Sequence, residues 1–70
     1  MKAIYSVGTD RKLPQEERTK QRQWIENNGL EWSARFADKS DAQRFVDKIE
    51  SATKVRLVIE TVYPVTMKVF

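Results

Sequence analysis

The side chains that most often carry catalysis are missing from this sequence. It contains no histidine and no cysteine, so proton transfer and nucleophilic attack would fall to carboxylates, lysine, tyrosine and serine. Two carboxylate pairs stand close in sequence, Asp38 with Asp41 and Glu16 with Glu17. Each pair lies where a helix is expected to begin, and there the positive end of the helix dipole explains a carboxylate. We therefore expect no catalytic residues and no enzyme.

Ligands for metals and cofactors are also scarce. The two commonest zinc ligands, cysteine and histidine, are both absent. Gly8 and Gly29 are the only glycines, and neither belongs to a glycine-rich phosphate-binding pattern. No segment offers oxygen ligands at the alternate positions of a calcium loop. The sequence therefore predicts neither a metal nor a cofactor.

One segment near the N-terminus concentrates positive charge. The chain has 13 basic and 10 acidic residues, a net charge of +3. A basic segment can follow a phosphate backbone while an indole ring stacks on a base. The alternative is a solvated helix face anchored in the core by its tryptophan, and the interspersed Glu16 and Glu17 favour it. The candidate nucleic-acid-binding residues are Arg11, Lys12, Arg18, Lys20, Arg22 and Trp24.

The C-terminal segment is a second candidate surface. Apolar residues alternate from Val55 to Phe70, and the interruption at Pro64 suits an edge strand or a bulge. One straight strand of that length would reach roughly 50 Å at about 3.3 Å a residue, whereas a globule of this size is about 30 Å across. The end of the chain must therefore bend back onto the sheet or pair with another chain, either a target protein or a second copy. In the second case the protein-binding residues are Tyr63, Val65, Met67, Val69 and Phe70.

The spacing of apolar residues indicates two further strands and one helix. Alternation predicts strands at Lys2–Val7 and Leu30–Ala37, with Trp32 on the core face of the latter. Ser40 and Gln43 would form a capping box at the start of the helix. Helical spacing predicts this amphipathic helix over residues 40–53. Its apolar stripe is Ala42, Phe45, Val46, Ile49 and Ala52.

The segment Pro14–Asn28 fits two structures. As a helix it would begin with Pro14 at its first position and end at Gly29 as a left-handed C-cap. Such a helix could bury only its last turn, through Trp24 and Ile25. As a strand, Lys20–Glu26 would turn directly into the next strand and bring like charges opposite each other, which is unfavourable. This repulsion favours the helix.

Together these elements predict a single α+β domain over residues 1–70. We expect a three- to four-stranded, largely antiparallel sheet with the helix at about 40–53 packed on one face and a second, polar helix at about 14–28. No apolar run reaches the roughly 20 residues of a membrane span, and the absence of cysteine suits the cytosol. The expectation is a soluble, cytoplasmic protein.

The strand–helix–strand pattern from Leu30 to Ile59 resembles many small α+β proteins, including compact regulators and inhibitors encoded by phages. The likeness is to a general type and rests on no signature residues, and the small size of the chain is what suggests a phage or mobile-element origin. We predict a small protein-binding module, a regulator or inhibitor, that contacts a target protein of unknown identity or forms a homodimer through its C-terminal strand. Nucleic-acid binding through the segment Arg11 to Arg22, with Trp24, is the alternative function.

Overall fold

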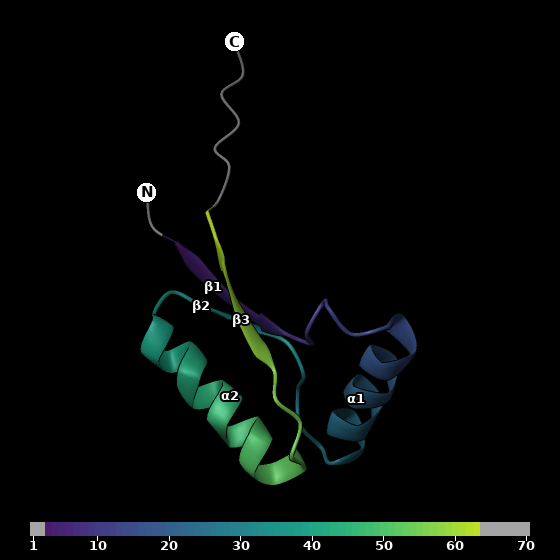
Figure 1. The fold of residues 1–70 in the computed structure, drawn as a ribbon. Helices are drawn as coiled ribbons and strands as arrows, with labels where there is room; N and C mark the ends of the chain where they lie inside the picture. Colours follow the sequence, from purple (N-terminus) through teal and green to yellow (C-terminus); the bar gives the residue numbers. More distant parts are fainter. Residues whose placement is uncertain (1–2, 64–70) are drawn as a thin grey trace.

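The computed structural model describes residues 3–63 (Figure 1). In chain order its elements are β1 (Ile4–Gly8), α1 (Gln15–Asn27), β2 (Ala34–Phe36), α2 (Lys39–Thr53) and β3 (Val58–Val62). The strands form an antiparallel sheet in the order β2-β1-β3, so β1 is central and β2 and β3 are the edges. The chain is an α+β fold with a three-stranded antiparallel sheet and two helices, and the predicted fold class is confirmed.

The register of the sheet sorts its side chains onto two faces. Val7 of β1 pairs with Ile59 of β3, and both pack into the core beneath α2. Ser6 pairs with Arg35 of β2 and Glu60 of β3 on the opposite side, because successive side chains of a strand point to opposite faces. We call this second side the open face. Its members are Ile4, Ser6, Gly8, Arg35, Val58, Glu60 and Val62.

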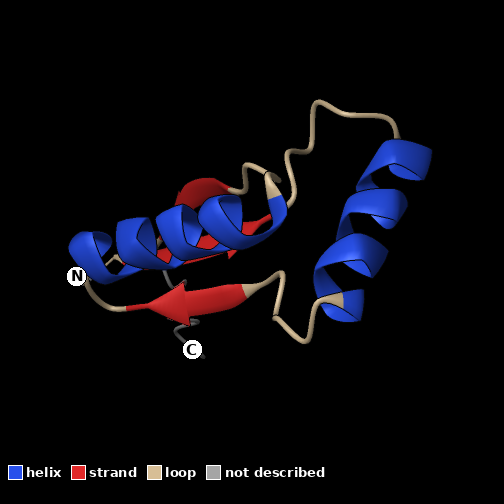
Figure 2. Cartoon of the chain, turned by 90° about the horizontal axis from the view of Figure 1, so that it is seen from below, coloured by secondary structure: helices blue, strands red, loops and turns tan. Residues whose placement is uncertain are grey.

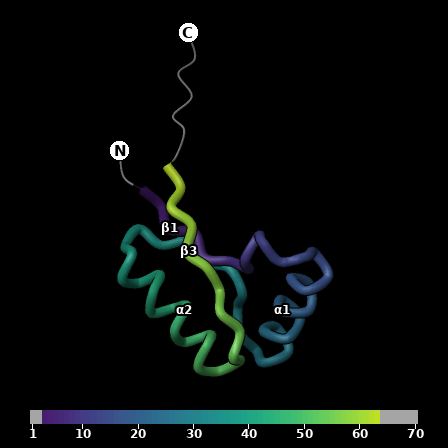
Figure 3. The backbone as a smooth tube through the Cα atoms, viewed as in Figure 1, coloured from purple at the N-terminus to yellow at the C-terminus, as the bar shows by residue number. Residues whose placement is uncertain are grey.

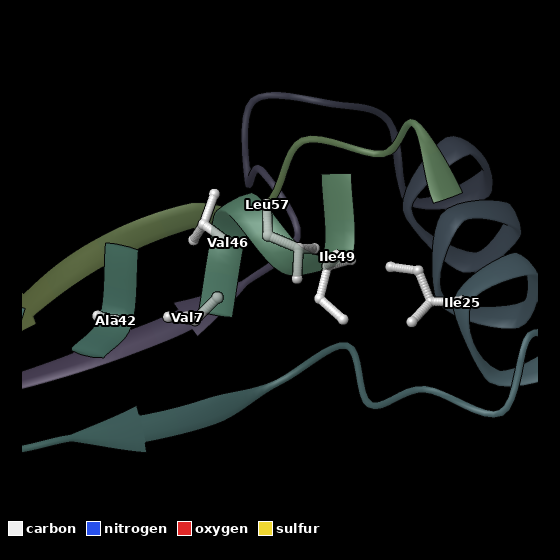
Figure 4. Close-up of a cluster of buried hydrophobic side chains, with 6 residues drawn as sticks. All are labelled: Val7, Ile25, Ala42, Val46, Ile49 and Leu57. Carbon is white, nitrogen blue, oxygen red and sulfur yellow. The ribbon is translucent and has the colours of Figure 1, made fainter. Parts of the chain in front are cut away.

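The core lies between α2 and the other face of the sheet (Figure 2). Burying a side chain such as Ile49 contributes roughly 1.5–3 kcal/mol, so this layer is a main source of stability. The predicted apolar stripe of α2 is confirmed except at its end. There Ala52 is exposed and Thr53 is buried, its hydroxyl donating to the Ile49 carbonyl at 2.7 Å. Figure 4 shows the buried cluster of Val7, Ile25, Ala42, Val46, Ile49 and Leu57.

Helix α1 stands to one side of the sheet. Among the described elements its backbone lies close to α2 and to no strand, and Figure 2 shows it separated from the layered body. Ile25 is its one buried residue, and its side chain points toward Ile49 (Figure 4). The preferred prediction of a helix is confirmed, and the rival strand is wrong. Trp24 departs from its predicted place in the core, because its side chain is 53% exposed.

The C-terminus of α1 is closed by a Schellman motif at Gly29. This residue has φ +73°, a left-handed conformation that costs an L-residue with a side chain roughly 1–2 kcal/mol. The Gly29 amide donates to the Glu26 carbonyl at 2.9 Å, and the Leu30 amide donates to the Ile25 carbonyl at 3.2 Å. These two bonds satisfy carbonyls that a helix end leaves unpaired. The predicted C-cap is confirmed.

Both predicted helix starts are displaced. α2 begins at Lys39, and Asp38 is its N-cap in an extended conformation without a side-chain cap hydrogen bond. The predicted capping box is therefore wrong, because Ser40 already lies inside the helix and Gln43 instead donates to the Asp47 carboxylate at 3.0 Å. Pro14 likewise precedes α1 as its N-cap and is not its first residue.

The strands are shorter than the apolar alternation predicts. The strand expected over Leu30–Ala37 is only Ala34–Phe36, which pairs with Tyr5–Val7 of β1, and residues 30–33 form no ladder with β1. The first strand spans Ile4–Gly8 and continues one residue past the predicted end at Val7, while Lys2 lies outside the described residues.

The long strand expected from Val55 begins only at Val58. Lys54 takes a left-handed conformation with φ 64°, and residues 55–57 lead the chain from α2 back to the sheet. Figure 3 shows this connection passing between the ends of the two helices. The part of that predicted strand after Tyr63 lies outside the described residues.

Candidate functional site

The outer side of β3 is an unpaired sheet edge within residues 3–63. β3 pairs with β1 alone, and no other backbone hydrogen bond joins Val58–Val62 to another part of the described chain. Unpaired strand edges are templates for a further strand. At the end of β3, Val62 and Tyr63 are 41% and 63% exposed. Within the described residues no strand covers this edge, and its apolar end is exposed.

A shallow groove of about 490 Å³ runs beside this edge, between α2 and β3. Its apolar lining is Val46, Leu57, Val58 and Ile59. Its polar lining is Lys39, Gln43, Asp47, Glu50 and Arg56. An added strand would place every second side chain on the side of the sheet that α2 covers. The groove offers those side chains an apolar floor with a charged rim.

The charged rim is partly neutralised by its own contacts. Arg56 donates from Nε to the Glu50 carboxylate at 2.6 Å. This hydrogen bond, together with the attraction between the two charges, raises the pKa of Arg56 above its usual value. Arg56 is therefore positively charged at any physiological pH. A partner that reaches this end of the groove meets a paired charge and not a free one.

Of the residues predicted to bind protein, Tyr63 lies at the exposed end of β3. Val65, Met67, Val69 and Phe70 lie outside the described residues. Local patterns in the sequence did not indicate the groove residues, because α2 and β3 come together only in the folded chain. The signal that would have located the groove is the order of strands, which no local pattern encodes.

The second candidate surface is a pocket at one end of the open face. The hollow measures about 170 Å³, and three arginines reach it from two parts of the chain. Arg11 comes from the turn after β1, while Arg18 and Arg22 are one helical turn apart on α1. We call this hollow the arginine pocket. Its remaining lining is Ser6, Val7, Gly8, Thr9, Trp32, Ser33, Val58 and Glu60.

Each arginine of the pocket is held by a different contact. Arg11 pairs with the Glu60 carboxylate at 3.4 Å, with both side chains substantially exposed. Arg18 donates from Nε to the hydroxyl of Thr9 at 3.2 Å, and Thr9 is buried. The guanidinium of Arg22 lies 4.6 Å from the centre of the Trp32 ring, a cation–π contact.

The other three residues of the predicted nucleic-acid surface do not line this pocket. Lys12 and Lys20 are exposed. The indole of Trp24 donates from Nε1 to the Thr53 carbonyl at 3.0 Å, which ties α1 to the end of α2. The predicted surface is thus divided, with three arginines gathered at the open face and Trp24 placed at the junction of the helices.

The aromatic residue at the pocket is Trp32, which the sequence analysis assigned to the core. Its ring is partly buried and packs against the core, while its Nε1 donates to the Glu26 carboxylate at 2.7 Å. Thr9, Ser6 and Ser33 were also missed. No sequence pattern signals these four residues, since the fold alone brings them beside Arg18 and Arg22.

Within residues 3–63, carboxylates do not gather in groups of three or more that could hold a metal ion. Neither helix of the described chain is long and apolar enough to cross a membrane.

No protein-family model, no curated protein and no solved structure matches this chain.

Proposed function

We propose that this protein is a small binding module that captures an extended segment of a target protein as a fourth strand beside β3. The observation that carries the proposal is the unpaired outer edge of β3 within the described chain, lying directly beside the α2–β3 groove. Strand addition supplies affinity through main-chain hydrogen bonds and specificity through pockets for alternate side chains. The edge of β3 offers the main-chain hydrogen-bonding groups, and the groove offers the space for alternate side chains. A module that holds such a segment acts as a regulator or inhibitor of its target.

The chemistry of the groove defines the segment that fits it. Its floor is formed by Val46, Leu57 and Ile59, so alternate residues of the segment should be apolar and of medium size. The intervening residues would join the open face beside Glu60 of β3, where a polar side chain is accommodated. The segment is therefore a strand-forming stretch with alternating apolar and polar residues.

The first experiment is affinity capture from a lysate of the native cells after nuclease treatment. The tag stands at the N-terminus, so that Phe70 is left free. Thr61 is exposed in β3 and pairs with Tyr5, on the side of the sheet that α2 covers. Thr61→Lys places a charge where an apolar side chain of the partner would lie. Asn27→Lys adds the same charge at an exposed position of α1, so it is the control.

The expected result is a discrete protein captured by the wild type and by Asn27→Lys but not by Thr61→Lys. The purified complex should then show slowed amide exchange at Val58–Val62. Equal capture by all three proteins, or no capture after nuclease treatment, would overturn strand addition to a target. If the protein alone sediments as a dimer that Thr61→Lys dissociates, the edge is occupied by a second copy instead.

Nucleic-acid binding is the second candidate function, and the convergence of three arginines on one pocket favours it. It ranks second because Glu26 and Glu31 lie next to Trp32, where a continuing phosphate backbone would pass. The double charge reversal Arg18→Glu with Arg22→Glu tests this function. A nucleic-acid binder should lose affinity for every sequence alike, and its affinity should fall steeply with salt. Capture at the β3 edge should be little changed by the same substitutions.

A further inference from the structure

The arginine pocket gathers more positive charge than its own acid neutralises. Arg11, Arg18 and Arg22 line it, and Glu60 is its single carboxylate. Like charges one helical turn apart, as in Arg18 and Arg22, destabilise a helix. The fold nevertheless directs both toward the same hollow. An anion in that hollow would turn the repulsion into attraction.

Within residues 3–63, the contacts of the three guanidiniums use only a few of their hydrogen-bond donors. Each guanidinium has five N–H donors. Arg18 uses Nε for Thr9, and Arg11 uses one terminal nitrogen for Glu60. The Nε of Arg22 is buried and has no hydrogen-bond partner among the described residues. This atom is closed to solvent, so a ligand in the hollow would have to bind the terminal N–H groups of Arg22.

The neighbours of Arg22 and Arg18 fix their positions before any ligand arrives. The ring of Trp32 supports the guanidinium of Arg22 at 4.6 Å, and the buried hydroxyl of Thr9 holds Arg18. Ser6 and Ser33 add two hydroxyls to the same lining. Arginine is suited to phosphate because its planar fork donates two parallel hydrogen bonds. Groups fixed in this way lose little entropy on binding.

We propose that the arginine pocket binds one phosphate group. The hollow of about 170 Å³ has room for one such oxyanion, given that a water molecule takes up roughly 30 Å³ of liquid. A phosphate monoester carries a charge of about −1.5 to −2 at neutral pH, which matches three arginines offset by one glutamate. Glu26 and Glu31 bound the positive region beyond Trp32, so the site suits a single phosphate and not a continuous backbone. This site does not depend on strand addition at β3.

The test is a titration of the full chain, followed by backbone amide chemical shifts, with inorganic phosphate as the probe. Shifts should saturate at Ser6, Thr9 and Ser33. Arg18→Gln and Arg22→Gln should each weaken binding about tenfold, since each removes a charge-assisted hydrogen bond. The matched control is Lys20→Gln, which removes one exposed charge from the same helix and should change the affinity less than twofold. Arg11 is largely exposed, so Arg11→Gln extends the test if Arg22→Gln disturbs the fold.

Two further probes distinguish the sources of the phosphate. O-phosphoserine should bind at the same residues as inorganic phosphate, and the affinity of oligothymidylates should not rise with their length. Absence of saturation with phosphate, or equal weakening by Lys20→Gln and Arg18→Gln, would overturn the proposal. An affinity that increases with oligonucleotide length would overturn the single-phosphate site in favour of nucleic-acid binding.

Discussion

The two helices of this protein are similar in length and differ in what they bury. α2 has 15 residues and buries Ala42, Val46, Ile49 and Thr53 against the sheet. α1 has 13 residues and buries Ile25 alone. Since most helix stability in proteins comes from packing an apolar face, α2 is held along its length. α1 is held at its C-terminal end, as Figure 1 makes visible in the way it stands beside the sheet.

Because of this difference, α2 mainly stabilises the fold, whereas most of α1 remains available to present side chains for binding. Three contacts hold the C-terminal end of α1: the burial of Ile25, the hydrogen bond from Trp24 to the Thr53 carbonyl, and the cap at Gly29. The rest of the helix is polar and is free to present Arg18 and Arg22 at the open face. α2 can supply the wall of the β3 groove because its buried stripe fixes it against the sheet.

The largest contrast between the helices should appear on truncating one buried isoleucine in each. Ile49→Ala should lower the free energy of unfolding by about 2–5 kcal/mol, because it leaves a cavity in the layer between α2 and the sheet. Ile25→Ala should cost less, since α1 can undock without opening that layer. Urea denaturation measures the first effect, and amide exchange confined to α1 reveals the second. Equal global losses from both substitutions would show that α1 and α2 form one cooperative unit.

The cap of α1 can be tested with a matched pair of glycines. Gly29→Ala should destabilise the protein by roughly 1–2 kcal/mol, because the residue has a positive φ. A Cβ at Gly29 would meet no atom within 4 Å, so the cost is purely conformational. Gly8 has the same open surroundings without a positive φ, and Gly8→Ala should not destabilise. Thermal or urea unfolding of both variants provides the comparison, and equal effects would contradict this account of the cap.

The link between the helices should make a smaller contribution. Trp24→Phe keeps an aromatic ring but removes the donor to the Thr53 carbonyl. The expected loss is about 0.5–1.5 kcal/mol, the net value of a typical hydrogen bond. Relative to the wild type, the variant should show amide exchange that accelerates more in α1 than in α2. If the exchange rates in both helices rise equally, the bond supports the whole fold and not the docking of α1.

The smallest effect is expected at the exposed ion pair on the rim of the groove. Arg56→Gln removes the contact with Glu50. Solvent screens this pair and side-chain entropy opposes it, so the unfolding curve should be unchanged within error. The same variant should alter capture of a partner if that end of the groove is occupied. A clear loss of stability would mean that the pair fixes the turn between α2 and β3.

The sequence analysis predicted the kinds of elements well, and their ends less well. The apolar stripe of α2 and the glycine after α1 are local signals, and the structure confirms both. The strand expected from Leu30 is shortened to Ala34–Phe36, because the length of a strand depends on its pairing with a distant segment, here β1. Trp32 shows the same limit of local sequence patterns at the arginine pocket. Its alternation correctly indicated contact with the core, but its place beside Arg22 depends on how α1 is set against the sheet.

The amino-acid sequence by itself determines composition and the features that depend on interactions between residues close together in the chain. The helical and alternating apolar patterns, the left-handed Gly29 and the lack of histidine and cysteine belong to this group. Only the tertiary structure decides that β3 is an edge, that a groove lies beside it and that Arg11 meets Arg18 and Arg22. These features join residues far apart in the chain. Their free energies arise from packing and charge contacts that exist only once the sheet and the helices have assembled.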